Sequence, residues 1–193
     1  VISAYRSTEG LRLRLTADGR PVKVGEPIRM LEARNSEVGR GSAMVIPGLF
    51  TLVCTNGMHH WSKEEVFRWT HLRADPKRIA EELRDAVGPA WEQAAELRSA
   101  WRRGLAVVLP VEQDEQAEPW LTELVRRLRM GHLLGKQLVE DVVAHLDHPT
   151  TARPERGRWS LATLTDAITL RAQQEALVER FELERAAGRL LEG

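Results

Sequence analysis

The stretch Leu11-Arg12-Leu13-Arg14-Leu15 alternates strictly between an apolar and a basic side chain. A period of two is that of a β-strand, in which successive side chains point to opposite faces of the sheet. Three leucines are therefore expected on one face and two arginines on the other. Because the leucine face must be covered, this pentapeptide predicts a sheet with further elements packed against one side.

More strands are expected around this one. Asp18-Gly19-Arg20 is a turn signal, after which residues 21–24 return antiparallel, and residues 28–33 form another strand. Residues 42–46 and 49–54 are expected to pair, with Pro47-Gly48 as the turn between them. The second of these apolar runs is also compatible with a partly helical segment.

From residue 75 onward the pattern becomes helical. Asp75-Pro76 predicts an N-cap followed by proline at the first helical position. Gly88-Pro89 is expected to end this helix and to start another. Pro119 opens a third helix. Residues 105–111 are apolar and are expected to form a short strand or a connector.

Two further helices are expected towards the end of the chain. One covers residues 134–146, and a polar loop follows it at residues 149–158. Ser160 then caps a long final helix that reaches about residue 191. The order of the chain, strands first and helices after, predicts an α+β fold. Residues 1–75 would form a basic, antiparallel sheet, and the amphipathic helices of residues 76–193 would cover it as one composite domain.

The composition excludes several classes of protein. A hydrophobic fraction of 42% is that of a globular chain. The sequence has no apolar run of about 18 residues, and its start has no basic segment followed by an apolar one, so neither a membrane span nor a secretion signal is expected. The single cysteine, Cys54, lies in an apolar run, which indicates a reduced thiol in the cytoplasm and excludes a cysteine-based zinc module.

Charge is balanced over the whole chain but not along it. Residues 1–80 hold 13 Lys/Arg and 8 Asp/Glu, a net charge of +5, so residues 81–193 have a net charge of −5. A basic front half favours an anionic partner such as nucleic acid. Two solvated faces, or two faces that pair within an oligomer, are equally compatible with this asymmetry.

Aromatic and basic residues gather near the expected junction of sheet and helices: Trp61, Lys63, Phe67, Arg68, Trp69, His71 and Arg73. Aromatic rings stack on bases while cations follow phosphates, which is how single-stranded nucleic acid is bound. Arg12 and Arg14, with Arg34 and Arg40 near a glycine-rich turn, would extend such a track. The competing interpretation is that the aromatic side chains of this set are core residues, since large aromatics usually are.

Four segments resemble one known family. Arg34-Asn35-Ser36-Glu37-Val38-Gly39, followed by Leu52-Val53-Cys54-Thr55-Asn56-Gly57, is similar to the central signature of the phage- and plasmid-associated family called domain of unknown function 932. Residues 161–169 and 184–191 resemble its C-terminal helix. The signature positions are Asn35, Ser36, Gly39, Cys54, Asn56 and Gly57. Relative to the family, this chain is shorter before the central signature, so it is expected to be a shortened member or to rely on a partner chain.

The resemblance implies a role in handling the DNA of a mobile element. Basic strands joined to helices also resemble, in outline, the single-strand annealing proteins that form rings on DNA. A DNA partner and a homo-oligomer are therefore what the resemblance implies.

Sites of other kinds are disfavoured. Gly39-Arg40-Gly41-Ser42 lacks the ending of a phosphate-binding Walker loop and is expected to be a hairpin or bulge. His59 and His71, with Glu64 or Glu65, are a weak metal candidate because no known zinc spacing is present. No serine or cysteine lies in a nucleophile motif. We therefore expect no enzyme activity, metal or cofactor.

The first hypothesis is a cytoplasmic, homo-oligomeric single-stranded DNA-binding protein that supports annealing or recombination. Phosphates would contact Arg12, Arg14, Arg34, Arg40, Lys63 and Arg68, and bases would stack on Trp61 or Trp69. The second is an interaction subunit without nucleic acid, whose final helix pairs with a partner through Leu164, Ile168, Leu177, Phe181 and Leu190. The third, and least favoured, is a metal-dependent enzyme that uses His59 and His71.

Overall fold

The structure is a computed structural model that describes residues 3–7, 10–15, 25–35, 42–52, 57–62, 66–69, 75–111, 114–127, 135–149, 151 and 159–192. The strands are β1 (Ser3–Ser7), β2 (Gly10–Leu15), β3 (Pro27–Asn35), β4 (Ala43–Leu52), β5 (Gly57–Trp61) and β6 (Phe67–Trp69). The helices are α1 (Pro76–Gly104), α2 (Asp114–Arg127), α3 (Lys136–Leu146), α4 (Leu161–Ala172) and α5 (Leu177–Glu192). The chain is therefore α+β, as predicted.

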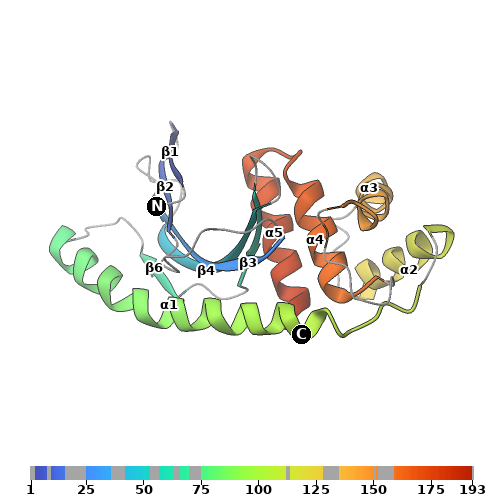
Figure 1. The fold of residues 1–193 in the computed structure, drawn as a ribbon. Helices are drawn as coiled ribbons and strands as arrows, with labels where there is room; N and C mark the ends of the chain where they lie inside the picture. The colour runs from blue at the N-terminus through green and yellow to red at the C-terminus, as the bar shows by residue number, and fades with distance from the viewer. Residues whose placement is uncertain are drawn as a thin grey trace.

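The strands form one antiparallel sheet in the order β1-β2-β3-β4-β5. β6 pairs with the first residues of β4, on the same edge that β5 occupies further along. α1 runs along one side of the sheet, and α4 and α5 stand at the end opposite to β1 and β2 (Figure 1). The helical half of the chain thus covers a sheet built by the first half.

Alternating residues divide the sheet into two apolar faces. The α1 face packs Leu31, Val45 and Phe67 against alanines of α1, and Leu49 against Leu97 of the same helix. The opposite face, called here the α5 face, packs Met30, Ile46, Phe50 and Trp61 together with Phe181 of α5. A third core joins α2, α3, α4 and α5 beyond the sheet.

β4 is continuous through Pro47-Gly48, so the turn predicted at these two residues is wrong. The direction of the Pro47 backbone groups explains why proline is tolerated within this strand. Its carbonyl accepts from the Ser62 amide at 2.9 Å, on the edge shared by β5 and β6. The nitrogen and carbonyl of one residue point to the same edge of an antiparallel strand. Because the backbone nitrogen of Pro47 points away from β3, its missing N–H removes no hydrogen bond to that strand. On the other edge, Pro47 lies between the residues that pair with β5 and those that pair with β6.

α1 is continuous through Gly88-Pro89, so the predicted break is also wrong. The predicted start is confirmed: Asp75 caps the helix, and its carboxylate accepts from the Lys77 amide at 3.0 Å. Ala86 and Ala90, on either side of Pro89, are buried in the same core against the sheet. A proline inside a helix costs about 3 kcal/mol. We infer that sheet packing on both sides of Pro89 outweighs this cost.

The predicted final helix is two antiparallel helices, α4 and α5, joined by a turn at residues 173–176. Ser160 caps the first of them as expected, in a capping box with Thr163. Leu164 and Ile168 of α4 lie in one core with Leu183 of α5. No glycine or proline marks the turn, so the break is imposed by packing: a single straight helix cannot bury both apolar segments in one core.

This hairpin contradicts the interaction hypothesis in its specific form. Leu164 and Ile168 are buried within the chain, Phe181 is buried against the sheet, and Leu190 is half-buried. The side chain of Leu177 lies outside the described residues. Leu164, Ile168 and Phe181 are therefore core contacts and are not available to a partner helix.

The remaining connections follow the predictions only in part. Residues 105–111 are a connector that makes a single bridge, between Val108 and Ser160. α2 begins at Asp114, so Pro119 lies inside the helix and does not open it. α3 confirms the helix predicted at residues 134–146, with its start at Lys136. Across the described segments, no helix has both the length and the apolarity needed to cross a membrane.

Candidate functional site

Trp61 is a core residue, which corrects its predicted role as a base-stacking side chain. It is 0% exposed, its ring stacks on that of His59 at 5.7 Å between centroids, and it packs against Phe181. A Cβ atom on Gly48, its partner in the ladder, would lie 2.5 Å from the Trp61 ring. On the other side, α5 passes so close at Gly188 that an added Cβ would overlap the Trp61 carbonyl. No base can reach this ring.

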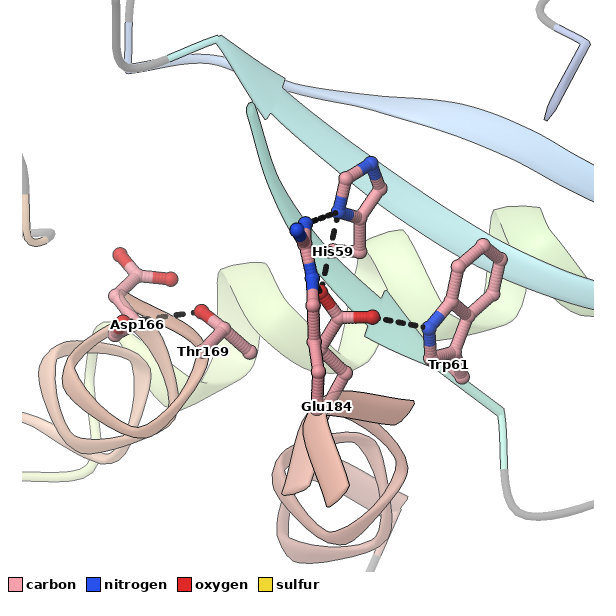
Figure 2. Close-up of polar contacts among 6 residues, drawn as sticks. His59, Trp61, Asp166, Thr169 and Glu184 are labelled. Carbon is pink, nitrogen blue, oxygen red and sulfur yellow. Dashed lines mark hydrogen bonds and ion pairs between the residues drawn. The ribbon is translucent and has the colours of Figure 1, made fainter. Parts of the chain in front are cut away.

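A buried carboxylate holds α5 against β5 (Figure 2). Glu184 is 1% exposed and accepts from the Trp61 indole N–H at 2.7 Å and from Nε of Arg180 at 2.8 Å. Nδ1 of His59 lies 3.3 Å from the same carboxylate. Buried charges are tolerated only when they are paired and hydrogen-bonded, and Glu184 has three such neighbours.

The same neighbours decide the ionisation of Glu184. Burial by itself raises its pKa, but the hydrogen bond and charge of His59, together with Arg180, outweigh burial and lower the pKa to about 2. Glu184 is therefore an anion throughout the physiological range. A permanently ionised, fully enclosed carboxylate serves as a structural link between helix and strand and not as a proton donor.

Nδ1 of His59 contacts both a hydrogen-bond acceptor, Glu184, and a hydrogen-bond donor, Arg180. This nitrogen is 3.3 Å from an oxygen of Glu184 and 3.2 Å from Nη2 of Arg180. The nitrogen donates to the carboxylate when it carries a proton and accepts from the guanidinium when it does not. The three side chains therefore form one coupled network.

A second buried acid lies on the other side of β5. Asp166 of α4 is 1% exposed and accepts from the indole N–H of Trp101 at 3.2 Å. Nε2 of His60 lies 3.1 Å from the same oxygen, but the contact lacks the alignment of a hydrogen bond. Adjacent residues of one strand, His59 and His60, thus face acids on two different helices, because successive side chains alternate between faces.

Sequence reasoning missed both acids as site residues, although a signal was present. Asp166 and Glu184 lie in the two C-terminal segments that carry the family resemblance. Asp166 is the only acid of α4, a helix whose other residues are mostly apolar or threonine, and an acid buried in such a helix requires a buried partner. The adjacent histidines 59 and 60 supplied the complementary signal and were weighed only as metal ligands.

The metal hypothesis gains no support from these contacts. Within the described segments, no three His, Cys, Asp or Glu side chains converge as a metal site would require. His71, Glu64 and Glu65, which the hypothesis also needs, lie outside the described residues.

Three of the predicted phosphate-binding arginines occupy one row across the sheet. Arg12 of β2 is opposite Arg34 of β3, Arg34 is opposite Met44 of β4, and Met44 is opposite Arg68 of β6. Directly opposite residues belong to the same face of a sheet. Met44 packs with the α5-face core, so these positions, called here the arginine row, belong to that face. Arg14 lies in the next row, opposite Glu32.

The other predicted contacts separate from this row. Trp69 follows Arg68 but is opposite Ala43, and it packs on the α1 face, where the guanidinium of Arg78 lies 5.2 Å from its ring. Trp69 and Arg68 therefore belong to opposite faces of the sheet, and base stacking by Trp69 stays a prediction that this register separates from the arginine row. Arg40 and Lys63 lie outside the described residues.

The two described signature positions, Asn35 and Gly57, lie at opposite ends of β4. Asn35 ends β3 at the start of β4, whereas Gly57 begins β5 at the end of β4. Ten residues of β4 separate these points, roughly 30 Å of extended chain. Ser36, Gly39, Cys54 and Asn56 lie outside the described residues.

Comparison of the chain with protein-family models, with curated proteins and with solved structures yields no match. The family resemblance therefore remains a prediction.

Proposed function

We propose that this protein binds single-stranded DNA along the arginine row and supports annealing or recombination on a mobile element. The observation that carries the proposal is the register of β2, β3, β4 and β6, which aligns Arg12, Arg34 and Arg68. Like charges directly opposite one another on adjacent strands destabilise a sheet. Arg12 and Arg34 occupy directly opposite positions in this register, so a polyanion laid across the two strands would offset this cost.

The dimensions and charge of the row support a nucleic-acid ligand. Three strand spacings separate Arg12 from Arg68, a span of about 14 Å. Arg68 is exposed, and residues 1–80 have the net positive charge that attracts polyanions. Phosphate contacts of this kind position a strand without selecting its sequence. The protein acts in this proposal as a non-catalytic homo-oligomer in the cytoplasm.

The test is a salt titration of binding to labelled single-stranded DNA, duplex DNA and single-stranded RNA. The variant replaces Arg12, Arg34 and Arg68 together with glutamine. Each phosphate contact contributes about 0.7 to the slope of log affinity against log salt for single strands, so the variant should lose about 2 from the slope.

The matched control replaces three exposed arginines of α1, namely Arg84, Arg102 and Arg103, with glutamine. Both triple variants remove the same total charge. Equal loss of affinity in the two variants would mean that net charge alone attracts the strand, and it would overturn the arginine row as the binding site. Absence of binding by the unmodified protein to all three ligands at low salt would overturn the function. A monomer in light scattering, both with and without DNA, would overturn the proposed homo-oligomer.

A further inference from the structure

The arginine row has a fifth position, on β1, and this position is occupied by an aromatic residue. β1 pairs with β2 so that Tyr5 is opposite Arg12. The row therefore has the order Tyr5, Arg12, Arg34, Met44 and Arg68 across five strands. Trp61 is enclosed by β4 and α5, and Trp69 belongs to the opposite face. Tyr5 is the only aromatic residue at a register position of this row.

We propose that Tyr5 is the base-stacking residue of the arginine row and that it makes the row prefer unpaired bases. This inference rests on the proposed function. An aromatic ring next to a line of cations is the arrangement by which proteins bind single strands, because every base has a face that stacks. In a duplex, those faces are already stacked on neighbouring base pairs, so Tyr5 adds affinity only for single strands.

The position of Tyr5 in the sheet fits this role. β1 is the outermost strand of the described sheet on its side, at the end opposite to β5 and α5 (Figure 1). Four strand spacings separate Tyr5 from Arg68, about 19 Å in total. A strand bound along the row thus meets the aromatic residue at one end and an exposed cation at the other.

Stacking and phosphate contact leave different signatures in the salt titration. Replacing Tyr5 with alanine should weaken single-strand binding about 5- to 150-fold, the range measured when a stacked ring is truncated. The salt slope should not change, because a neutral ring releases no counterions. Tyr5→Phe keeps the aromatic face and should retain nearly all of the affinity. Duplex affinity should be the same in all three proteins.

Tyr5 is the only tyrosine of the chain, so a tyrosine-specific reagent reports on this one position. The second measurement treats the unmodified protein with tetranitromethane, with and without an oligothymidylate of about 12 nucleotides. Mass spectrometry of the peptide that contains Tyr5 reads the extent of nitration. Nitration of the free protein and protection by the oligonucleotide are expected.

The outcomes separate this inference from the function on which it rests. If the unmodified protein binds single strands and Tyr5→Ala binds equally well, or if DNA gives no protection, the stacking role is overturned and the phosphate row stands. A Tyr5 that resists nitration without DNA is enclosed, which also overturns the stacking role. If no nucleic acid binds at all, the proposed function fails first. A Tyr5→Phe protein that loses affinity as Tyr5→Ala does, with unchanged thermal unfolding, shows that the hydroxyl and not the ring is used.

Discussion

Two regions of the sheet carry their charges in opposite ways. At β5, Glu184 is enclosed and is surrounded by His59, Trp61 and Arg180, which join one helix to one strand. Across β2, β3 and β6, by contrast, the register aligns three residues of the same charge. A buried charge requires partners of opposite charge or hydrogen-bond donors, whereas like charges directly opposite each other on adjacent strands are unfavourable. The first region joins a helix to the sheet, and the second is the region for which we propose a ligand.

The largest effect on stability is expected at Gly188, where α5 touches the backbone of β5. Gly188→Ala would place a methyl group onto the Trp61 carbonyl, a backbone atom that cannot move aside. We expect a loss of about 4 kcal/mol in the free energy of unfolding, measured by urea denaturation. Gly88→Ala is the matched control, because a Cβ there meets nothing within 4 Å. That substitution should stabilise the helix by up to about 1 kcal/mol. Equal effects of the two would show that α5 does not lie against β5 as described.

The buried carboxylate gives the next largest effect. Glu184→Gln removes the charge that His59 and Arg180 face and should cost about 3 kcal/mol, because it leaves a guanidinium without its partner. Glu179→Gln, at an exposed position of the same helix, should change stability by less than about 0.5 kcal/mol. Denaturation curves of both variants test this. Single-strand binding by folded Glu184→Gln should match that of the parent protein, and a specific loss of binding would place Glu184 in the ligand site.

The pH dependence of stability should sharpen the same assignment. The pKa of Glu184 is lowered from 4.5 to about 2, so its stabilising contribution is complete above the unfolded value of 4.5 and is lost as pH falls towards 2. The stability difference between the parent protein and Glu184→Gln should therefore shrink over this window. Urea titrations at pH 7, 4.5 and 3 measure that difference. A difference that stays constant down to pH 3 would contradict the lowered pKa.

The smallest effect on stability is expected in the arginine row. Arg68→Gln should change the free energy of unfolding by less than about 0.5 kcal/mol, because the side chain is exposed. The same substitution should weaken single-strand binding and lower the salt slope by about 0.7. Thermal unfolding and anisotropy measured on one preparation test both halves. A large loss of stability without a change in the salt slope of binding would show that Arg68 is a structural residue. The arginine row would then not differ in role from the region around Glu184.

Local signals were sufficient where one short segment decides the outcome. The alternation of residues 11–15 predicted a strand, and the caps at Asp75 and Ser160 predicted two helix starts, all of which the structure contains. The errors concern segments whose conformation depends on distant partners. Pro47-Gly48 and Gly88-Pro89 have the composition of turns, yet each lies inside a regular element. Pairing with neighbouring strands outweighs local preference at the first pair, and packing against the sheet does so at the second.

The sequence by itself determined the α+β class, the basic character of the first 80 residues and the arginines that could meet phosphate, because these follow from composition and period. The tertiary structure alone decided which of those residues share a face. It placed Trp61 beneath α5, turned Trp69 towards α1 and aligned Tyr5 with Arg12. Pairing between strands and contact between a helix and a sheet join residues far apart in the chain, and no local pattern records their register.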